Sequence, residues 1–251
     1  MEAAPSQALA GHAALVTGGA RRIGSALALA LHAAGADILL HYRSSADAAR
    51  GLADTLNATR PGSAALVQAD LLDADAPAQL VAATRAAFGR LDILVNNASA
   101  FYPTPIGELT ESAWDELVGT NLKAPLFLAQ AAAPLLMEAR GLVLNLVDIH
   151  GLKPLRGYST YSIAKAGLIM LTKSLARELA PQVRVNAVAP GPVLWPEGAD
   201  AGLREEIISR TLLKRAGSPE DVARAVLYFA CDAPYVTGRI LAVDGGRSVG
   251  W

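Results

Sequence analysis

Residues 13–24 read AALVTGGARRIG, a short apolar run followed by a turn that contains three glycines. The apolar run Ala13–Thr17 predicts a buried strand, and the stretch from Ser25 to Ala34 predicts a helix that stops at Gly35. A strand, a glycine turn and a helix form the local pattern of a dinucleotide-binding unit, because glycines let the backbone approach a pyrophosphate and the helix N-terminus supplies amides. Tight glycine turns also occur in other α/β proteins, so the rest of the chain has to support this interpretation.

Downstream of that turn, apolar runs alternate with helix-like stretches to the end of the chain. This alternation predicts a parallel sheet with right-handed crossovers. We expect an α/β protein with a Rossmann-type, doubly wound parallel sheet of seven strands and helices on both faces, formed by residues 1–251 as one domain. The further strands are expected at Ala36–Leu40, Ser63–Gln68, Leu91–Val95, Leu142–Val147, Val183–Val188 and Ile240–Val243, and helices at 46–56, at 77–88, from Thr110 past Asn121, at 158–179 and at 218–229.

The composition excludes several classes of protein. A hydrophobic fraction of 52% over 251 residues suits a packed core, and a net charge of -1 gives no basic field for nucleic acid. The single cysteine, Cys231, excludes an internal disulfide, and the four histidines lack metal-ligand spacing, so we expect no metal. Met1–Ala10 does not resemble a signal peptide, and no run of 18 apolar residues occurs. We therefore expect a cytoplasmic protein without membrane or nucleic-acid partners.

The segment after the second expected strand, His41-Tyr42-Arg43-Ser44, bears on the choice of cofactor. Folds that bind NAD usually carry an acidic residue here for the ribose 2′-hydroxyl, and this chain has none. A guanidinium with neighbouring hydroxyls suits a 2′-phosphate, so Arg43 favours NADP over NAD. Alternatively, Ser44 or Ser45 simply caps the following helix.

Tyr161 and Lys165 lie four residues apart on an expected helix, which places them on one face, one turn apart. An ammonium about 4 Å from a phenol stabilises the phenolate by roughly 4 kcal/mol at an effective dielectric constant near 20, so we expect Lys165 to lower the pKa of Tyr161. Asp148 follows the apolar run Leu142–Val147, at a strand end where open α/β sheets bind ligands. A Tyr-x-x-x-Lys pair is by itself common, and it gains meaning only from these surroundings.

With these motifs in order, nearly the whole chain resembles the short-chain dehydrogenase/reductase family. The shared landmarks are the Thr17-Gly18 turn, Asp70, Asn96-Asn97-Ala98, Asn121, Tyr161-x-x-x-Lys165 and Pro190-Gly191. Arg22 stands where the family usually has glycine, and Asp148 stands where it usually has serine, thirteen residues before Tyr161. Both departures, together with 41–44 and 97–103, resemble the pteridine reductase branch, whereas Val193-Leu194 differs from some of its members.

The resemblance implies NADPH as hydride donor, a pterin as substrate and Tyr161 as proton donor. Lys165 would hold the nicotinamide ribose, Asp148 would supply protons to Tyr161, and Asn121 would extend the relay through water. The implied cofactor-binding residues are Gly18, Arg22, Ile23, His41, Tyr42, Arg43, Ser44, Asp70, Leu71, Asn97, Ala98, Ser99, Lys165, Pro190, Gly191 and Val193. The implied substrate-binding residues are Arg22, Ser99, Phe101, Asp148, Tyr161 and Trp195.

Three further expectations concern this site. Residues 193–213 would form a lid. Tyr158 would orient Asp148 or contact the substrate, unless it merely packs on the helix surface. The family is usually tetrameric, so we expect a homotetramer in which Arg247 or Trp251 borders a neighbouring active site.

Two other functions remain open at this stage. The same fold could serve a carbonyl reductase that acts on an oxoacyl chain or a small ketone, although a serine would then be expected at position 148. A protein that binds NADP as a sensor without turnover would not need Tyr161 and Lys165 together, yet both are present.

Overall fold

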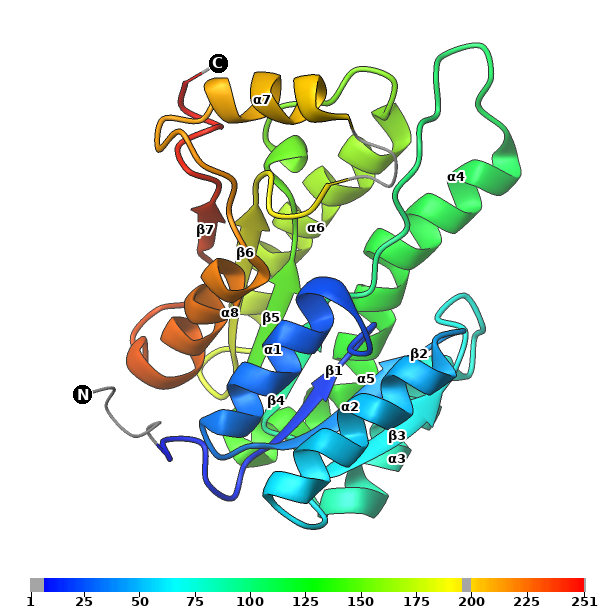
Figure 1. The fold of residues 1–251 in the computed structure, drawn as a ribbon. Coiled ribbons are helices and arrows are strands. Elements are labelled where there is room, and N and C mark those ends of the chain that lie inside the picture. Colours follow the sequence, from blue (N-terminus) through cyan, green and yellow to red (C-terminus); the bar gives the residue numbers. More distant parts are fainter. Residues whose placement is uncertain (1–6, 196–199, 251) are drawn as a thin grey trace, which may run out of the picture.

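A computed structural model describes residues 7–195 and 200–250 of the chain. Seven parallel strands form one sheet in the order β3-β2-β1-β4-β5-β6-β7, with helices on both faces (Figure 1), so the expected fold class is confirmed. The strands are β1 (Ala13–Val16), β2 (Asp37–Tyr42), β3 (Ala64–Gln68), β4 (Ile93–Asn96), β5 (Leu142–Leu146), β6 (Arg184–Pro190) and β7 (Ile240–Val243).

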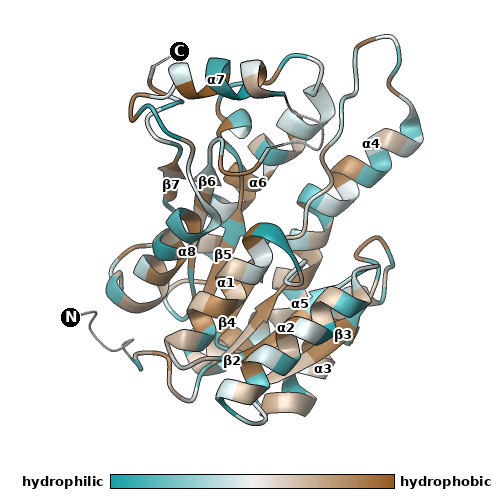
Figure 2. Cartoon of the chain, in the orientation of Figure 1, coloured by the Kyte–Doolittle hydropathy of each residue, from teal (hydrophilic) through white to brown (hydrophobic). Residues whose placement is uncertain are grey.

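Each face of the sheet has its own apolar core, because successive side chains of a strand point to opposite sides. On one face, Ala14 and Val16 pack with α1 (Arg22–Ala33), α2 (Ala46–Thr59) and α8 (Pro219–Leu227). On the other, Leu15 packs with α3 (Ala76–Phe88), α5 (Ala124–Ala139) and α6 (Ser159–Glu178). Figure 2 accordingly shows predominantly hydrophobic strands between helices of mixed polarity. Because helices cover both faces, polar functional side chains are expected at the ends of the strands.

The single helix expected from Thr110 past Asn121 is three segments. Thr110 caps α4 (Glu111–Val118) by accepting a hydrogen bond from the Ala113 amide, as expected. A π-helical segment, η1 (Gly119–Lys123), then joins α4 to α5. Asn121 lies in this segment and is fully buried, which the sequence pattern does not indicate. A π-helical turn inside a longer helix often marks a functional position.

The region expected to form a lid, 193–213, contains the helix α7 (Ala201–Ser209). None of the residues of α7 is buried, so the helix lacks the apolar face that would have revealed it in the sequence. Ser218, in contrast, begins α8 with a capping box that includes Asp221, and this helix start was expected.

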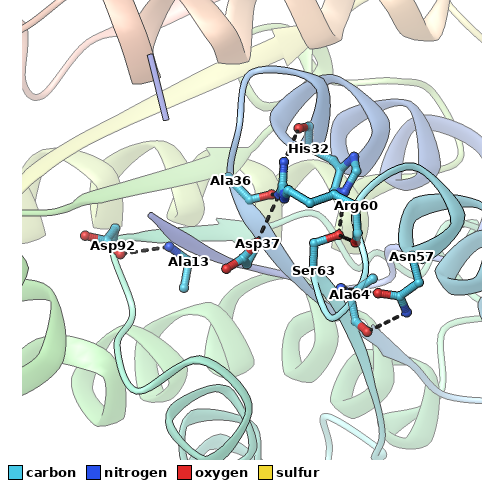
Figure 3. A network of polar contacts seen from close by, with 9 residues as sticks. All are labelled: Ala13, His32, Ala36, Asp37, Asn57, Arg60, Ser63, Ala64 and Asp92. Atoms are coloured by element: carbon cyan, nitrogen blue, oxygen red, sulfur yellow. Dashed lines mark hydrogen bonds and ion pairs between the residues drawn. The ribbon is translucent and has the colours of Figure 1, made fainter. Parts of the chain in front are cut away.

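A network of polar contacts lies at the amino end of the sheet (Figure 3). The Arg60 guanidinium donates to the carbonyl oxygens of His32 and Ala36 and to the Asp37 carboxylate. The His32 ring is hydrogen-bonded to the Ser63 hydroxyl at 2.7 Å. These contacts attach the C-terminal ends of α1 and α2 to the amino end of the sheet. The predicted site residues lie at the other, carboxyl end of the strands.

Candidate active site

All seven strands are parallel, so the residues predicted to act together follow strand ends at one edge of the sheet. The chain order reverses between β1 and β4, which are adjacent although β2 and β3 come between them in the sequence. Loops diverge at such a point and leave a crevice that binds ligands in open α/β sheets. The candidate site is therefore built from the loops after β1, β2, β4, β5 and β6.

The turn after β1 is held closely against the loop after β4. The Thr17 hydroxyl accepts hydrogen bonds from the Asn97 and Ala98 amides at 2.9 and 3.0 Å. The Asn97 side-chain amide donates to the carbonyl oxygens of Thr17 and Gly18. Gly18 has a φ of +60°, and a Cβ atom at Gly24 would lie 2.2 Å from the Gly18 carbonyl oxygen. Gly18 thus favours glycine by its conformation and Gly24 by its close contact with the turn, which packs the turn tightly at the start of α1.

Arg22 opens α1 in a left-handed conformation, with a φ of +56°. This conformation costs a residue with a Cβ atom about 1 kcal/mol or more, and glycine would adopt it freely. The preceding residue, Arg21, forms no side-chain cap, and the first turn of α1 carries no acidic residue. Free amides and two arginines at a helix N-terminus fit the diphosphate of a dinucleotide cofactor.

The resemblance implied that His41 binds the cofactor, whereas the structure buries its ring. Its ring is 2% exposed and lies beneath the glycine turn, where Nδ1 accepts a hydrogen bond from the Gly18 amide at 3.1 Å. Nε2 is 3.1 Å from the Ala69 carbonyl oxygen and must donate to it. An amide can only donate, so this geometry requires the neutral ring protonated on Nε2. His41 therefore connects the backbone of the glycine turn with the segment after β3.

Arg43 lies at the end of β2 with its side chain 58% exposed. Ser45 occupies the N-cap position of α2, but its side chain makes no capping hydrogen bond. The alternative that Ser45 serves the helix as a cap is therefore not supported, whereas Ser44 beside it is exposed. A guanidinium and nearby hydroxyls are suitable donors for a phosphate group.

The central feature of the site is a hydrogen bond from the Tyr161 hydroxyl to Asp148 Oδ2, at 2.8 Å. Oδ1 of the same carboxylate accepts from the His150 amide at 2.8 Å, so Asp148 also caps the short 3-10 helix η2 (Ile149–Gly151). Tyr161 is only 4% exposed. Burial first, and then the charge and hydrogen bond of Asp148, raise the pKa of Tyr161 well above its ordinary value, against a lowering hydrogen bond from Ser99.

This direction is opposite to the one predicted from the sequence. The Lys165 ammonium lies 5.7 Å from the centre of the Tyr161 ring and donates to the Leu146 carbonyl oxygen at 2.9 Å. Burial lowers the pKa of Lys165 to about 8, although the Asp148 carboxylate opposes this shift. The prediction that Lys165 lowers the pKa of Tyr161 is thus wrong for this arrangement, because desolvation and the carboxylate dominate. Tyr161 is held as a neutral proton donor beside a buried cation.

An aromatic wall stands next to this pair. Phe101 stacks on Tyr158, with ring centroids 4.7 Å apart and planes inclined by 16°, and meets Tyr161 edge to face at 4.8 Å. Phe101 is nevertheless 45% exposed, so part of its ring is available to a ligand. Tyr158 consequently supports Phe101. The same loop is paired with the start of α6, because the Thr104 amide donates to the Gly157 carbonyl oxygen.

Asn121 holds the loop that carries this wall. Its side-chain oxygen accepts from the Ser99 hydroxyl at 2.7 Å, and its nitrogen donates to the carbonyl oxygens of Ala100 and Leu117, both at 2.9 Å. The side chain is thus engaged with protein groups. It positions Ser99 near the Tyr161 hydroxyl, and its place in a water relay stays a prediction.

The other predicted site residues lie in the apolar cores, beside α7 or at strand ends. Ile23, Leu71 and Val193 pack against the apolar cores, which fixes the loops that carry them. Trp195 lies beneath the Arg204 guanidinium of α7, 5.8 Å from ring centre to guanidinium carbon. The remaining residues predicted to bind the cofactor lie at or just after strand ends: Tyr42 ends β2, Asp70 caps the turn after β3, Pro190 ends β6 and Gly191 follows it. Trp251 lies outside the described residues, so the homotetramer with a shared tail stays a prediction.

Sequence reasoning did not single out the support beneath the site. Asn145, near the carboxyl end of β5, accepts a hydrogen bond from Asn96 at 2.8 Å and donates to the Thr172 hydroxyl at 2.9 Å. All three side chains are buried. The chain ties β4 and β5 to α6, the helix that carries Tyr161 and Lys165. A polar residue inside the apolar run Leu142–Val147 was the available signal.

Two general observations complete the description. Among residues 7–195 and 200–250, no helix combines the length and apolarity needed to cross a membrane. The same residues contain no cluster of three or more His, Cys, Asp or Glu side chains placed to hold a metal ion.

Comparison with known proteins places these features in context. A family model described as enoyl-(acyl carrier protein) reductase matches residues 18–248. Pteridine reductase 1 of Leishmania tarentolae is 41% identical, with 94% of this chain and 96% of that protein aligned. The 3-oxoacyl-(acyl-carrier-protein) reductase of Synechocystis is 38% identical, covering 95% and 98%. The enzyme of the same name from Staphylococcus aureus is 36% identical, covering 93% and 96%.

Replacing Arg22 by glycine should separate stability from binding. Glycine relieves the left-handed strain, so we expect the free energy of unfolding in urea to rise by up to about 1 kcal/mol. Affinity for NADPH, followed by its fluorescence, should fall by about tenfold with the loss of a charge-assisted contact. Arg85→Ala removes an exposed charge from α3, on the opposite face of the sheet, and serves as the control. Lower stability with unchanged affinity would contradict the assignment.

The neutral ring of His41 predicts a loss of stability on acidification. Burial lowers the pKa of His41 in the folded chain, so the unfolded chain binds the proton more readily. This contribution to stability is complete above the ordinary pKa of about 6.5 and is lost as the pH falls through the lowered pKa. The pKa of His32 is also lowered by burial, so its contribution to stability is likewise lost on acidification.

His41→Asn keeps an acceptor for the Gly18 amide and does not titrate in this range. Urea unfolding at about pH 7.5 and about pH 5 should therefore show a smaller pH-dependent loss in this variant than in the wild type. An identical loss in both proteins would show that His41 does not need to be neutral.

Proposed function

The chain belongs to the short-chain dehydrogenase/reductase family of oxidoreductases, and from that premise we propose that it is an NADPH-dependent pteridine reductase. The observation that carries the proposal is the hydrogen bond between Tyr161 and Asp148. A carboxylate at this position can both receive protons from solvent and return them to the phenol, which suits reduction of a nitrogen heterocycle. Its substrates would be dihydropterins, and the class would extend to folates, which carry the same ring.

The glycine turn and the ends of the strands would hold the cofactor. The amides at the start of α1, with Arg22, would face the diphosphate, and Arg43 with Ser44 would face the 2′-phosphate. The Lys165 ammonium would hydrogen-bond the nicotinamide ribose. When bound there, NADPH supplies a hydride to an adjacent substrate carbon.

The proton would come from Tyr161. Its raised pKa keeps the phenol protonated at neutral pH, as a general acid requires before transfer. Once the substrate nitrogen takes that proton, the buried phenolate would be stabilised by the Lys165 ammonium, whose pKa of about 8 leaves it mostly charged at neutral pH. Asp148, half-buried and bonded to the hydroxyl, would then return a proton to Tyr161. A C=N bond thereby gains one hydride and one proton.

The aromatic wall would select a flat substrate. A pterin ring could stack on Phe101, which Tyr158 supports from its other side. Ser99 would bond the edge of the ring, and Arg22 would reach it from the glycine turn. Trp195 and α7 would close over the site as part of the expected lid.

A second candidate is reduction of an oxoacyl carbonyl. Relatives at 36% and 38% identity carry that name over nearly the whole chain, and the Tyr161 and Lys165 pair suits a ketone equally well. Asp148 distinguishes the two, because the serine expected at position 148 for a carbonyl reductase could donate a hydrogen bond to the carbonyl oxygen, whereas an ionised Asp148 carboxylate can only accept one.

A comparison of substrates tests the function directly. NADPH oxidation would be followed by absorbance with dihydrobiopterin, dihydromonapterin, dihydrofolate, an acetoacetyl thioester and a small ketone. We expect turnover of at least one dihydropterin with a higher kcat/KM than any carbonyl compound. Turnover confined to the thioester or ketone would replace the proposal with the second candidate. Binding of NADPH without any turnover would indicate a sensor.

Asp148→Asn should lower kcat for the dihydropterin by about a hundredfold, because proton delivery to Tyr161 is lost. NADPH affinity should be unchanged. The carboxylate raises the pKa of Lys165, so its removal should also move the alkaline limb of kcat/KM to lower pH. Tyr161→Phe should lower kcat by about a hundredfold or more. The control Asp54→Asn, on the exposed side of α2, should change neither kcat nor NADPH affinity. An unaltered rate would make Asp148 purely structural.

A further inference from the structure

Glu116 of α4 connects two parts of the candidate site that are distant in sequence. Its Oε2 accepts a hydrogen bond from the Tyr102 hydroxyl at 3.0 Å. Its Oε1 lies 3.9 Å from Nη1 of Arg43, the residue proposed to hold the 2′-phosphate. One carboxylate therefore faces the loop after β2 and the loop after β4, which carries Phe101 beside Tyr102.

The two contacts differ in strength. The Arg43 and Glu116 side chains are 58% and 38% exposed, so their ion pair is partly solvated and can open readily. The hydrogen bond to Tyr102 is shorter and partly desolvated, and burial together with Glu116 raises the pKa of Tyr102. The same hydroxyl lies 3.3 Å from the Ala113 carbonyl oxygen on α4, so its one proton is shared between the two acceptors. Glu116 is thus anchored by Tyr102 and faces Arg43 as a nearby negative charge.

We propose that Glu116 is a specificity-determining residue whose carboxylate competes with the cofactor's 2′-phosphate for Arg43. The inference rests on the proposed use of NADPH and assigns a residue that limits its affinity. A 2′-phosphate bound to Arg43 would share the guanidinium with the Glu116 carboxylate and lie close to its negative charge, and both effects weaken NADPH binding. NADH has a hydroxyl at that position and carries no such charge. Glu116 therefore reduces the preference for NADPH that Arg43 creates.

The test measures dissociation constants of NADPH and NADH by fluorescence titration, without turnover. Glu116→Gln keeps an acceptor for Tyr102 and removes the charge. We expect it to tighten NADPH binding by about three- to tenfold and to leave NADH binding unchanged. Asp115→Asn removes the same charge from the adjacent exposed residue of α4 and should have no comparable effect.

A double-mutant cycle identifies the route of the effect. In an Arg43→Ala background, Glu116→Gln should no longer tighten NADPH binding. Tyr102→Phe removes the anchoring hydroxyl and should give an NADPH affinity between that of the wild type and that of Glu116→Gln. These results together would establish competition at Arg43.

The outcomes also separate this inference from the proposed function. If Arg43→Ala abolishes the preference for NADPH while Glu116→Gln changes nothing, the inference alone is overturned. The same holds if Glu116→Gln tightens NADH equally, or if Asp115→Asn matches its effect. A chain that binds neither nucleotide would overturn the proposed function and the inference with it.

Discussion

The uniform direction of the seven strands is the constraint on which the site depends. Because every strand ends at the same edge, the loops after β1, β2, β4, β5 and β6 reach one crevice from positions spread over most of the chain. The reversal of order between β1 and β4 opens that crevice. Thr17 then fixes its width, since one hydroxyl accepts two amides of the loop after β4. This arrangement brings Arg22, Asp148 and Tyr161, which are far apart in the sequence, to the same crevice.

Within the crevice, burial and the charge of Asp148 both raise the pKa of Tyr161, but they oppose each other at Lys165. Desolvation favours the neutral forms of both Tyr161 and Lys165. The Asp148 carboxylate shifts the pKa of each in the same direction, which keeps the phenol protonated and helps keep the ammonium charged. A protonated Tyr161 hydroxyl beside a charged Lys165 ammonium would be the state from which the phenol donates its proton to a substrate. The buried chain of Asn96, Asn145 and Thr172 holds the supporting elements in register.

Family membership fixes the architecture more firmly than the substrate. Relatives named pteridine reductase and 3-oxoacyl-(acyl-carrier-protein) reductase both align over more than nine-tenths of this chain. Their common scaffold follows from the sheet and the two apolar cores, which many substrates can share. Under the proposed function, selection among substrates would come from a few side chains at the crevice, above all Asp148, Phe101 and Arg22. These are also positions where local rules are broken, as the left-handed Arg22 illustrates.

The sequence by itself determined the order of strands and helices, the glycine turn and the caps at Thr110 and Ser218, because each depends on residues close together in the chain. It also indicated that Asp148, Tyr161 and Lys165 converge. Only the tertiary structure decided the direction of the Tyr161 pKa, the burial of His41 beneath the turn, the π-helical segment at Asn121 and the approach of Glu116 to Arg43. Those features depend on desolvation and on contacts between segments far apart in sequence, and neither has a local pattern that could reveal it.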